Sequence, residues 1–167
     1  STLCSCLATH AVLKRFYDID RRPLPEKLWG VYDHRVCWPD HPLLAGINTR
    51  FDVPHSRFND ITRSQLEAAG LHVLVESDEG GVHMAVSEDH FRAIFLQGHP
   101  EYDINSLLKD YKREVLRFLN GEIPRPPPLP EHYLTNGAVK ITQSFADAAV
   151  RARAEGVELP SCLEPAI

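Results

Sequence analysis

The chain has 167 residues, of which 43% are hydrophobic and 25% are charged, and it carries a formal net charge of -5. These proportions are ordinary for a globular protein, and the length is sufficient for one domain with a hydrophobic core. The negative charge and the scattered basic residues argue against nucleic acid as a partner. No apolar stretch approaches the length of a membrane span and no signal peptide is recognisable, so we expect a cytoplasmic protein without a membrane partner.

The first part of the chain alternates strand-like and helix-like segments. Residues 7–16 place apolar side chains on one helical face, and Pro23 and Pro25 interrupt the pattern that follows. Thr62 can cap a short helix that Gly70 ends. In chain order we expect a buried strand end at 1–5, a helix at 7–16, a strand at 29–36, a loop at 41–48, an extended segment at 51–57 and a helix at 62–69.

Three successive strands and a long helix come next. Turn-forming residues at 78–81 and 87–89 separate the apolar segments, which makes hairpins the expected connection. Apolar residues then recur at helical spacing until Gly121, and this is the clearest amphipathic pattern in the chain. We expect strands at 71–75, 82–86 and 91–96, and a helix from Ile104 to Leu119.

The end of the chain differs in composition from the rest. Five prolines between Pro124 and Pro130 predict an extended connector, and 134–153 is expected to form a last helix. We therefore divide the chain into a folded domain at 1–122 and a proline-rich connector with a helix and tail at 123–167. The mixture of hairpins and helical crossovers predicts an α/β layer fold, whose sheet is expected to need further strands before residue 1.

A histidine and a carboxylate stand two residues apart directly after the last predicted strand. Gly98 ends the strand, and His99 and Glu101 leave it on the same side because an extended backbone has a period of two. A carboxylate in this position can orient an imidazole that acts as a general base. The other interpretation is a strand-end histidine bonded to a backbone carbonyl, and the sequence leaves both open.

Cys6 is the best candidate for the nucleophile that such a base would serve. It lies at the predicted strand-to-helix turn, where a helix N-terminus lowers the pKa of a thiol and the Leu7 backbone N–H can face a developing oxyanion. The alternative is a small buried cysteine. Cys4 alternates with Cys6 along the strand, and we expect it to serve packing.

All cysteines are expected to be reduced. The chain has four, none of which forms a Cys-x-x-Cys pair, and no cluster of histidine and cysteine has the spacing of zinc ligands. The sequence therefore predicts no metal site and no disulfide. The four are Cys4, Cys6, Cys37 and Cys162.

Two further polar residues have an ambiguous setting. His55 lies in a polar tetrapeptide after an apolar segment, and we interpret it as part of an ordinary turn. Arg113 lies nine residues after Ile104 and so on the opposite face of the predicted helix, which favours a solvated arginine over one that binds a carboxylate.

Four short motifs follow one another along residues 1–122. They are Cys6-Leu7-Ala8-x-His10-Ala11-x-Leu13, Glu26-Lys27-Leu28-x-Gly30-Val31-Tyr32-Asp33-His34, Pro54-His55-Ser56-Arg57 and Gly98-His99-Pro100-Glu101-Tyr102-Asp103. In this order they resemble the homoserine O-succinyltransferase family. The residues from Ile123 onward depart from the better-known members of that family.

The resemblance implies a fold and a set of catalytic residues. The fold would be that of class I glutamine amidotransferases, a flavodoxin-like layered sheet, with a Cys-His-Glu triad. Cys6 would be the acyl-thioester nucleophile, His99 the general base and Glu101 its orienting carboxylate. The backbone of Leu7 would then be an oxyanion donor.

The resemblance also implies the substrates. The family's substrate-contacting residues fall on Lys27, Ser56 and Arg113, which reverses the solvated interpretation of Arg113. The activity would be acyl transfer from an acyl-CoA to L-homoserine in methionine biosynthesis, with succinyl-CoA as first choice and acetyl-CoA as alternative. We expect no bound cofactor and a homo-oligomer.

The family protein is about twice as long as this chain. The absent N-terminal half would supply the second oxyanion donor and much of the acyl-CoA pocket. Two other functions stay open: a glutamine hydrolase of the amidotransferase type, which would act without acyl-CoA, and a non-catalytic fragment, in which Cys6 would not be labelled.

Overall fold

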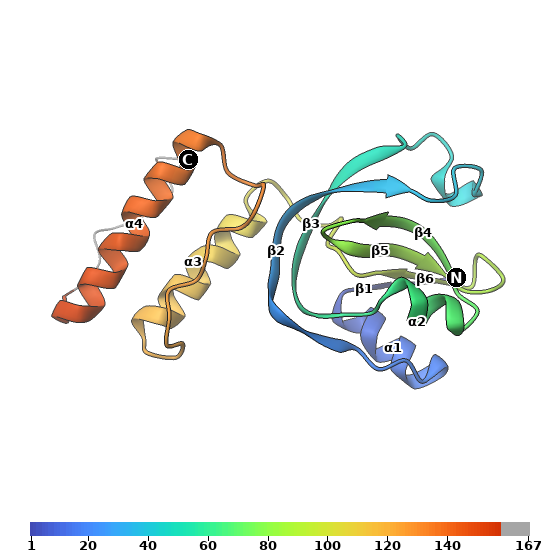
Figure 1. The fold of residues 1–167 in the computed structure, drawn as a ribbon, viewed down its shortest axis with the longest axis horizontal. Helices are drawn as coiled ribbons and strands as arrows, with labels where there is room; N and C mark the ends of the chain where they lie inside the picture. Colours follow the sequence, from blue (N-terminus) through green and yellow to red (C-terminus); the bar gives the residue numbers. More distant parts are fainter. Residues whose placement is uncertain (158–167) are drawn as a thin grey trace. The chain divides into compact units, whose positions relative to one another are not determined.

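The computed structural model describes residues 1–157. The chain divides into two compact units, one from Ser1 to Tyr102 and one that begins at Asp103 (Figure 1). The predicted boundary at residue 122 stays a prediction. Among the residues described, no helix combines the length and apolar character needed to cross a bilayer.

The first unit is built on a six-stranded sheet with the strand order β1-β6-β5-β4-β2-β3. β1 and β6 pair in parallel, and the remaining neighbours pair antiparallel. The strands are β1 (Thr2–Ser5), β2 (Arg22–Val36), β3 (Arg50–Asp60), β4 (His72–Ser77), β5 (Gly81–Val86) and β6 (Ala93–Leu96). The helices are α1 (Leu7–Tyr17), the 3-10 helix η1 (Pro42–Leu44) and α2 (Arg63–Ala68). The predicted α/β class is confirmed.

A hydrophobic core lies between α1, α2 and the sheet. Leu13 of α1 and Leu66 of α2 are each 1% exposed and belong to one cluster of buried side chains. Cys4 of β1 and Phe95 of β6 join them. The apolar face predicted for residues 7–16 is wrong in part: Leu13 is buried, but Leu7 and Phe16 are 63% and 71% exposed, and the polar Thr9 and His10 are buried instead. Cys4 is 4% exposed and serves packing, as expected.

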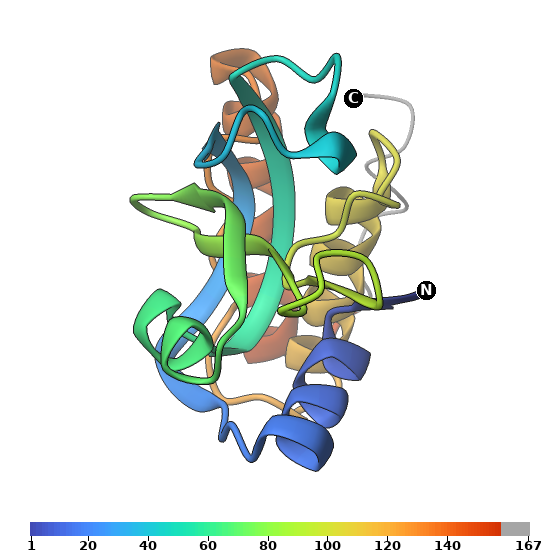
Figure 2. The same ribbon diagram turned by 90° about the vertical axis from the view of Figure 1, so that its right-hand side faces the viewer.

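β2 and β3 are longer than predicted. They form an antiparallel ribbon whose strands run side by side in Figures 1 and 2. β2 begins at Arg22 and includes Pro23 and Pro25, where a break was expected. The pairing shifts register between Pro23 and Leu28, and such an irregularity accommodates prolines, which lack the backbone N–H of a regular ladder. The predicted loop at 41–48 contains η1.

The three strands predicted in succession are confirmed, with one boundary corrected. Phe91 and Arg92 were assigned to the last strand but belong to the turn before it. Their backbone N–H groups donate to Asp89 Oδ1 at 3.4 and 3.0 Å. The carboxylate competes for the donors that a strand would use, so β6 begins at Ala93.

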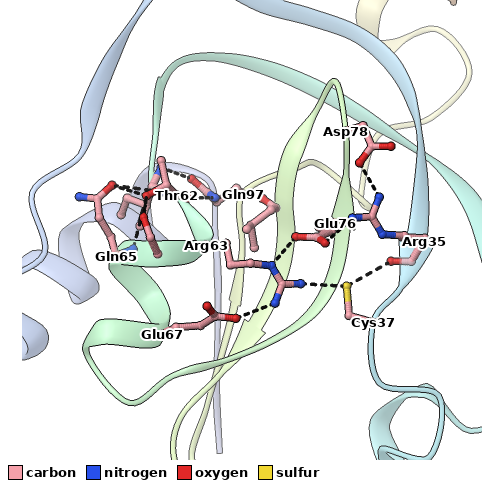
Figure 3. Close-up of polar contacts among 12 residues, drawn as sticks. Arg35, Cys37, Thr62, Arg63, Gln65, Glu67, Glu76, Asp78 and Gln97 are labelled. Atoms are coloured by element: carbon pink, nitrogen blue, oxygen red, sulfur yellow. Dashed lines mark hydrogen bonds and ion pairs between the residues drawn. The ribbon is translucent and has the colours of Figure 1, made fainter.

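Side chains fix the start of α2 (Figure 3). The Thr62 hydroxyl accepts from the Gln65 N–H at 3.4 Å, and the Gln65 side chain accepts from the Thr62 N–H at 3.1 Å. This reciprocal pair confirms Thr62 as the predicted cap. Arg63 donates to Glu76 at 2.7 Å and contacts Cys37 Sγ at 3.2 Å, which ties α2 to β4 and to the end of β2.

The second unit contains α3 (Ser106–Leu119) and α4 (Asn136–Glu155), which pack on each other. The apolar face of α3 is buried as its spacing predicts. Ile104 was expected to open that helix, but it precedes α3 and is 83% exposed. Thr135 caps α4, and Gly156 ends it with a positive φ of 66°.

Candidate active site

Cys6 is the single residue between β1 and α1. Its backbone adopts φ 49° and ψ -116°, a conformation that residues with a side chain rarely adopt. The Cys6 N–H donates to the Leu96 carbonyl at 2.8 Å, which anchors the bend to the end of β6. A strained bend at a strand-to-helix turn is the backbone arrangement that exposes a nucleophile.

Thr9 holds the first turn of α1 against the two parallel strands. Its side chain is fully buried, and the hydroxyl oxygen lies 2.9 Å from the Cys4 carbonyl and 2.8 Å from the Leu96 carbonyl. These two contacts hold the first turn of α1 against β1 and β6, next to Cys6. Sequence reasoning missed Thr9, although a hydroxyl beside the apolar stripe of α1 was the available signal.

His99 and Glu101 form the predicted pair, but through a turn rather than an extended backbone, since the Tyr102 N–H donates to the His99 carbonyl at 3.1 Å. His99 Nδ1 lies 2.8 Å from Glu101 Oε1. Because a carboxylate only accepts, Nδ1 carries the proton and Nε2 is left for the Cys6 thiol, which is hydrogen-bonded to His99. Tyr102 stacks on the imidazole at 4.3 Å, and Ser5 Oγ donates to Glu101 Oε2 at 3.5 Å.

The hydrogen bonds of this site set its ionisation. The bond from His99 lowers the pKa of the Cys6 thiol below its ordinary value of 9.0, against the opposing effect of burial. Burial lowers the pKa of His99, but the bonds to Cys6 and Glu101 outweigh it and raise that pKa. The two shifts favour a thiolate beside an imidazolium, which is the reactive form of a cysteine nucleophile.

The Leu7 backbone N–H points at the same site. It is hydrogen-bonded to the Cys6 sulfur and so also lowers the pKa of that thiol. An acyl group on this sulfur would bring its carbonyl oxygen close to the first turn of α1. The role of Leu7 as an oxyanion donor remains a prediction.

The lowered thiol pKa predicts a measurable reactivity. Alkylation of Cys6 by iodoacetamide follows the thiolate, so its pH profile should have a midpoint below 9.0. His99→Ala removes the largest stabilising contact and leaves burial and the Glu101 charge, which both raise the pKa, so the midpoint should move upward. Peptide mass spectrometry separates Cys6 from the other thiols, and an unchanged midpoint in the variant would contradict the pairing.

Lys27 and Ser56 share one face of the β2–β3 ribbon. Trp29 and Ser56 are cross-strand partners and therefore point to the same side. The Lys27 ammonium lies over the Trp29 ring, 3.7 Å from its centroid, and 5.7 Å from the centroid of Phe58. The structure thus brings the two predicted substrate contacts onto one surface, and contact with a substrate remains a prediction.

Arg113 belongs to α3 in the second unit. Its side chain is 62% exposed, and the guanidinium lies 2.9 Å from Asp110 and 3.9 Å from Glu114. It therefore lies on the polar face that helical spacing predicted. Its assignment to the substrate carboxylate remains a prediction.

His55 does not lie in an ordinary turn, as its sequence context suggested. It is fully buried within β3, and its ring stacks on that of His34 at 5.0 Å. The tetrapeptide looked like a turn because its residues are polar. Alternation along a strand places His55 and Arg57 inside and Ser56 on the opposite face.

Gln97 is a buried residue that sequence reasoning missed. Its side-chain amide donates to the carbonyls of Ile61 and Val82 at 2.8 and 2.9 Å. Its oxygen accepts from the Ile61 N–H at 2.9 Å and lies 3.1 Å from His10 Nε2. Figure 3 shows this side chain next to the start of α2. Gln97 thus anchors the segment that leads to His99.

The cysteines and acidic residues show no sign of a metal centre within residues 1–157. Cys4, Cys6 and Cys37 are free thiols, as predicted, and Cys162 lies outside the described residues. In the same part of the chain, no three histidine, cysteine or carboxylate side chains are arranged to hold a metal ion.

Comparison with known sequences identifies relatives over the whole chain. A family model described as homoserine O-succinyltransferase matches residues 1–150. The homoserine O-succinyltransferases of Nitrosococcus oceani and Thioalkalivibrio nitratireducens are 58% and 59% identical, over 100% and 99% of this chain. These alignments cover 47% and 46% of the relatives, so the chain spans about half their length. The likeness continues past residue 122, beyond which the sequence was expected to depart from the family.

Comparison with solved structures identifies the fold. A glutamine amidotransferase from Methylobacillus flagellatus superimposes with a TM-score of 0.54 at 16% identity, over 96% of this chain and 65% of that one. One from Thermotoga maritima has a TM-score of 0.51 at 16% identity, over 92% and 60%. At this identity the likeness shows the fold alone, and the predicted class I glutamine amidotransferase-like fold is confirmed. The family match over residues 1–150 adds what the fold leaves open: the chain belongs to the homoserine O-succinyltransferase family.

Proposed function

We propose that this chain carries the nucleophile and the general base of a homoserine O-acyltransferase that uses succinyl-CoA. The observation that carries the proposal is the hydrogen-bonded series Cys6–His99–Glu101 at a strained strand-to-helix turn, in a chain of this family. The relatives bear the name homoserine O-succinyltransferase, which favours succinyl-CoA over acetyl-CoA as donor. In this proposal the protein acts in methionine biosynthesis in the cytoplasm, as a homo-oligomer and without a bound cofactor.

The first half-reaction forms an acyl-enzyme. The Cys6 thiolate attacks the thioester carbonyl of the acyl-CoA, and the Leu7 N–H stabilises the oxyanion. The intermediate collapses by breaking the bond between the acyl carbon and the sulfur of coenzyme A. The His99 imidazolium gives its proton to that departing thiolate, so coenzyme A leaves as a thiol and His99 becomes neutral.

The second half-reaction returns the enzyme to its starting state. Neutral His99 takes the proton from the homoserine hydroxyl, and the oxygen attacks the acyl carbon. The bond to Cys6 breaks, which restores the thiolate beside an imidazolium. Glu101 keeps Nδ1 protonated and stabilises the charge that His99 acquires in this step.

Two rival functions make different predictions. A glutamine hydrolase would use the same thiolate on a carboxamide, and the likeness to glutamine amidotransferases favours it only at the level of the fold. A non-catalytic role predicts no acyl-enzyme. Because the chain spans about half of its relatives, we assign the rest of the acyl-CoA pocket to the remaining part of the whole protein.

The test uses the whole protein and follows each half-reaction. Incubation with succinyl-CoA but without homoserine should release coenzyme A and leave a succinyl adduct on Cys6, identified by peptide mass spectrometry. Addition of L-homoserine should discharge the adduct. Ammonia release from glutamine without any acyl-CoA reaction would favour the hydrolase, and neither reaction would favour the non-catalytic role.

Arg113 supplies a separate prediction about the acceptor. If its guanidinium holds the homoserine carboxylate by a two-pronged contact, Arg113→Lys keeps the charge but loses the planar fork. The value of kcat/KM for homoserine should fall by roughly tenfold or more, on the order of one lost charged hydrogen bond. Release of coenzyme A in the first half-reaction should stay near normal. Unchanged homoserine kinetics would return Arg113 to the solvated interpretation.

A further inference from the structure

Three histidines are buried together beneath the segment that carries His99. They are His34 on β2, His55 on β3 and His83 on β5, with exposed fractions of 0%, 0% and 4%. The rings of His34 and His55 stack at 5.0 Å, and the ring of His83 meets them edge-on at 5.5 and 6.1 Å. We call this group the buried histidine cluster.

The hydrogen bonds of the cluster run in one direction. Arg57 Nε donates to His55 Nδ1 at 3.3 Å, because a guanidinium cannot accept. His34 Nδ1 donates to the Tyr32 carbonyl at 2.8 Å, because a carbonyl cannot donate. His55 Nδ1 is thus an acceptor, so the His55 proton is on Nε2, and the His34 proton is on Nδ1. In the contact between the two rings, His55 Nε2 therefore donates to His34 Nε2 at 3.2 Å. If His34 took a second proton, its Nε2–H would face the Nε2–H of His55. If His55 took one, its Nδ1–H would face the Arg57 Nε–H.

The surroundings of the cluster also keep it uncharged. Arg57 is 5% exposed and ion-paired with Asp60 at 2.7 Å, and the other charged groups near the rings are Asp33, Asp52, His99 and Glu101. Burial first, and then neighbouring charges that include Arg57, lower the pKa of His55 and lower that of His83 to about 3. Burial and the fixed hydrogen-bond directions thus both favour the neutral form of the cluster.

The segment Gln97–His99 is tied to the backbones of β5 and β3, and its middle residue lies against the rings of the cluster. The Gln97 N–H donates to the His83 carbonyl at 2.8 Å, and the His99 N–H donates to the Pro54 carbonyl at 2.8 Å. Between them, a Cβ added to Gly98 would lie 2.7 Å from Val53 Cγ1, 2.8 Å from His83 Nδ1 and 2.9 Å from His55 Nε2. Real Cβ atoms do not approach so closely, so only glycine lets the segment sit on the rings.

We infer that the neutral buried histidine cluster is a positioning element for the candidate active site, in which His55 and His83 set the place at which His99 meets Cys6. The inference rests on the proposed role of His99 as the partner of the thiol. The cluster takes no chemical step in this inference. Its rings affect the site only by positioning the backbone of Gln97–His99.

The test measures the pairing of Cys6 with His99 rather than acyl transfer. His55→Leu removes both hydrogen bonds of the central ring, whereas His55→Gln keeps a terminal donor for His34. For the folded His55→Leu protein, iodoacetamide should alkylate Cys6 at least about tenfold more slowly at about pH 6, because one unit of thiol pKa changes the thiolate fraction tenfold. His55→Gln should stay within about threefold of the unsubstituted protein.

A matched control is available in the same unit. His41 is 2% exposed and packs on the rings of Trp38 and His90, away from the cluster. His41→Leu should lower the melting temperature while leaving the pH midpoint of Cys6 alkylation in place. An equal shift in the His41 variant, or an unshifted midpoint in folded His55→Leu, would overturn the inference.

A second variant keeps the inference testable if His55→Leu does not fold. Gly98→Ala leaves the hydrogen bonds of the cluster intact but pushes the segment off the rings, so it should raise the same midpoint. A folded Gly98→Ala protein with an unshifted midpoint refutes the inference. The proposed function would fail independently of this inference if Cys6 took no acyl group from succinyl-CoA while its alkylation still changed in the cluster variants as expected.

Discussion

Cys6→Ser is expected to lower turnover by at least about a thousandfold, because the chemistry requires a thiolate and a serine hydroxyl is not ionised in its place. The Cys6 sulfur receives hydrogen bonds from His99 and from the Leu7 N–H, and both contacts lower its pKa. A hydroxyl at the same bend has no comparable anionic form near neutral pH. Steady-state kinetics with acyl-CoA and homoserine, together with the loss of the acyl adduct, would measure the effect.

Cys4→Ser is the matched control for this substitution. Cys4 stands on β1, two residues before Cys6, but is 4% exposed in the core, and burial raises the pKa of its thiol. Its replacement buries a hydroxyl at a cost of about 1–3 kcal/mol in stability, yet turnover per folded molecule should change little. An adduct on Cys4, with Cys6 free, would overturn the assignment of the nucleophile.

Glu101→Gln is expected to lower kcat by about a hundredfold to ten-thousandfold, as the loss of an orienting carboxylate does in comparable sites. The carboxylate accepts a hydrogen bond from His99 Nδ1, with 2.8 Å between the nitrogen and the oxygen. Burial lowers the pKa of His99, but this bond and the bond to Cys6 raise it overall. An amide can present its NH₂ group to Nδ1 and so favour the wrong tautomer, with Nε2 protonated and unable to act as a base. The KM for homoserine should change much less, because Glu101 contacts His99 and not the acceptor in this proposal.

Ser5→Ala provides the comparison for the second variant. Ser5 Oγ reaches the other oxygen of Glu101 at 3.5 Å, a long contact whose loss should change kcat by less than about tenfold. A Glu101→Gln protein with normal kcat would show that the carboxylate is incidental. A Ser5→Ala protein as impaired as Glu101→Gln would instead place the orienting role on the Ser5 contact.

The elements that depend on local pattern were predictable from the sequence. A helix that starts at Leu7, the cap at Thr62 and the apolar face of α3 all agree with the local pattern. The buried face of α1 does not, because Thr9 and His10 are buried while Leu7 and Phe16 are exposed. The two central features of the candidate site were also predictable. Cys6 stands at a strand-to-helix bend, and His99 lies beside Glu101, because both relations span only one or two residues of backbone, although a turn and not an extended segment joins the second pair.

Features that depend on pairing between distant parts of the chain were visible only in the tertiary structure. The register in which β2 pairs with β3 cannot be read from the sequence. The sequence therefore did not show that β2 starts at Arg22 and includes two prolines, or that His55 is buried. Gln97 likewise has partners 15 and 36 residues away along the chain. The sequence by itself supplied the candidates for the proposed chemistry. Only the packing of distant strands placed buried polar side chains such as Gln97 and His55 next to them, because a polar residue becomes an interior anchor only when remote partners satisfy its hydrogen bonds.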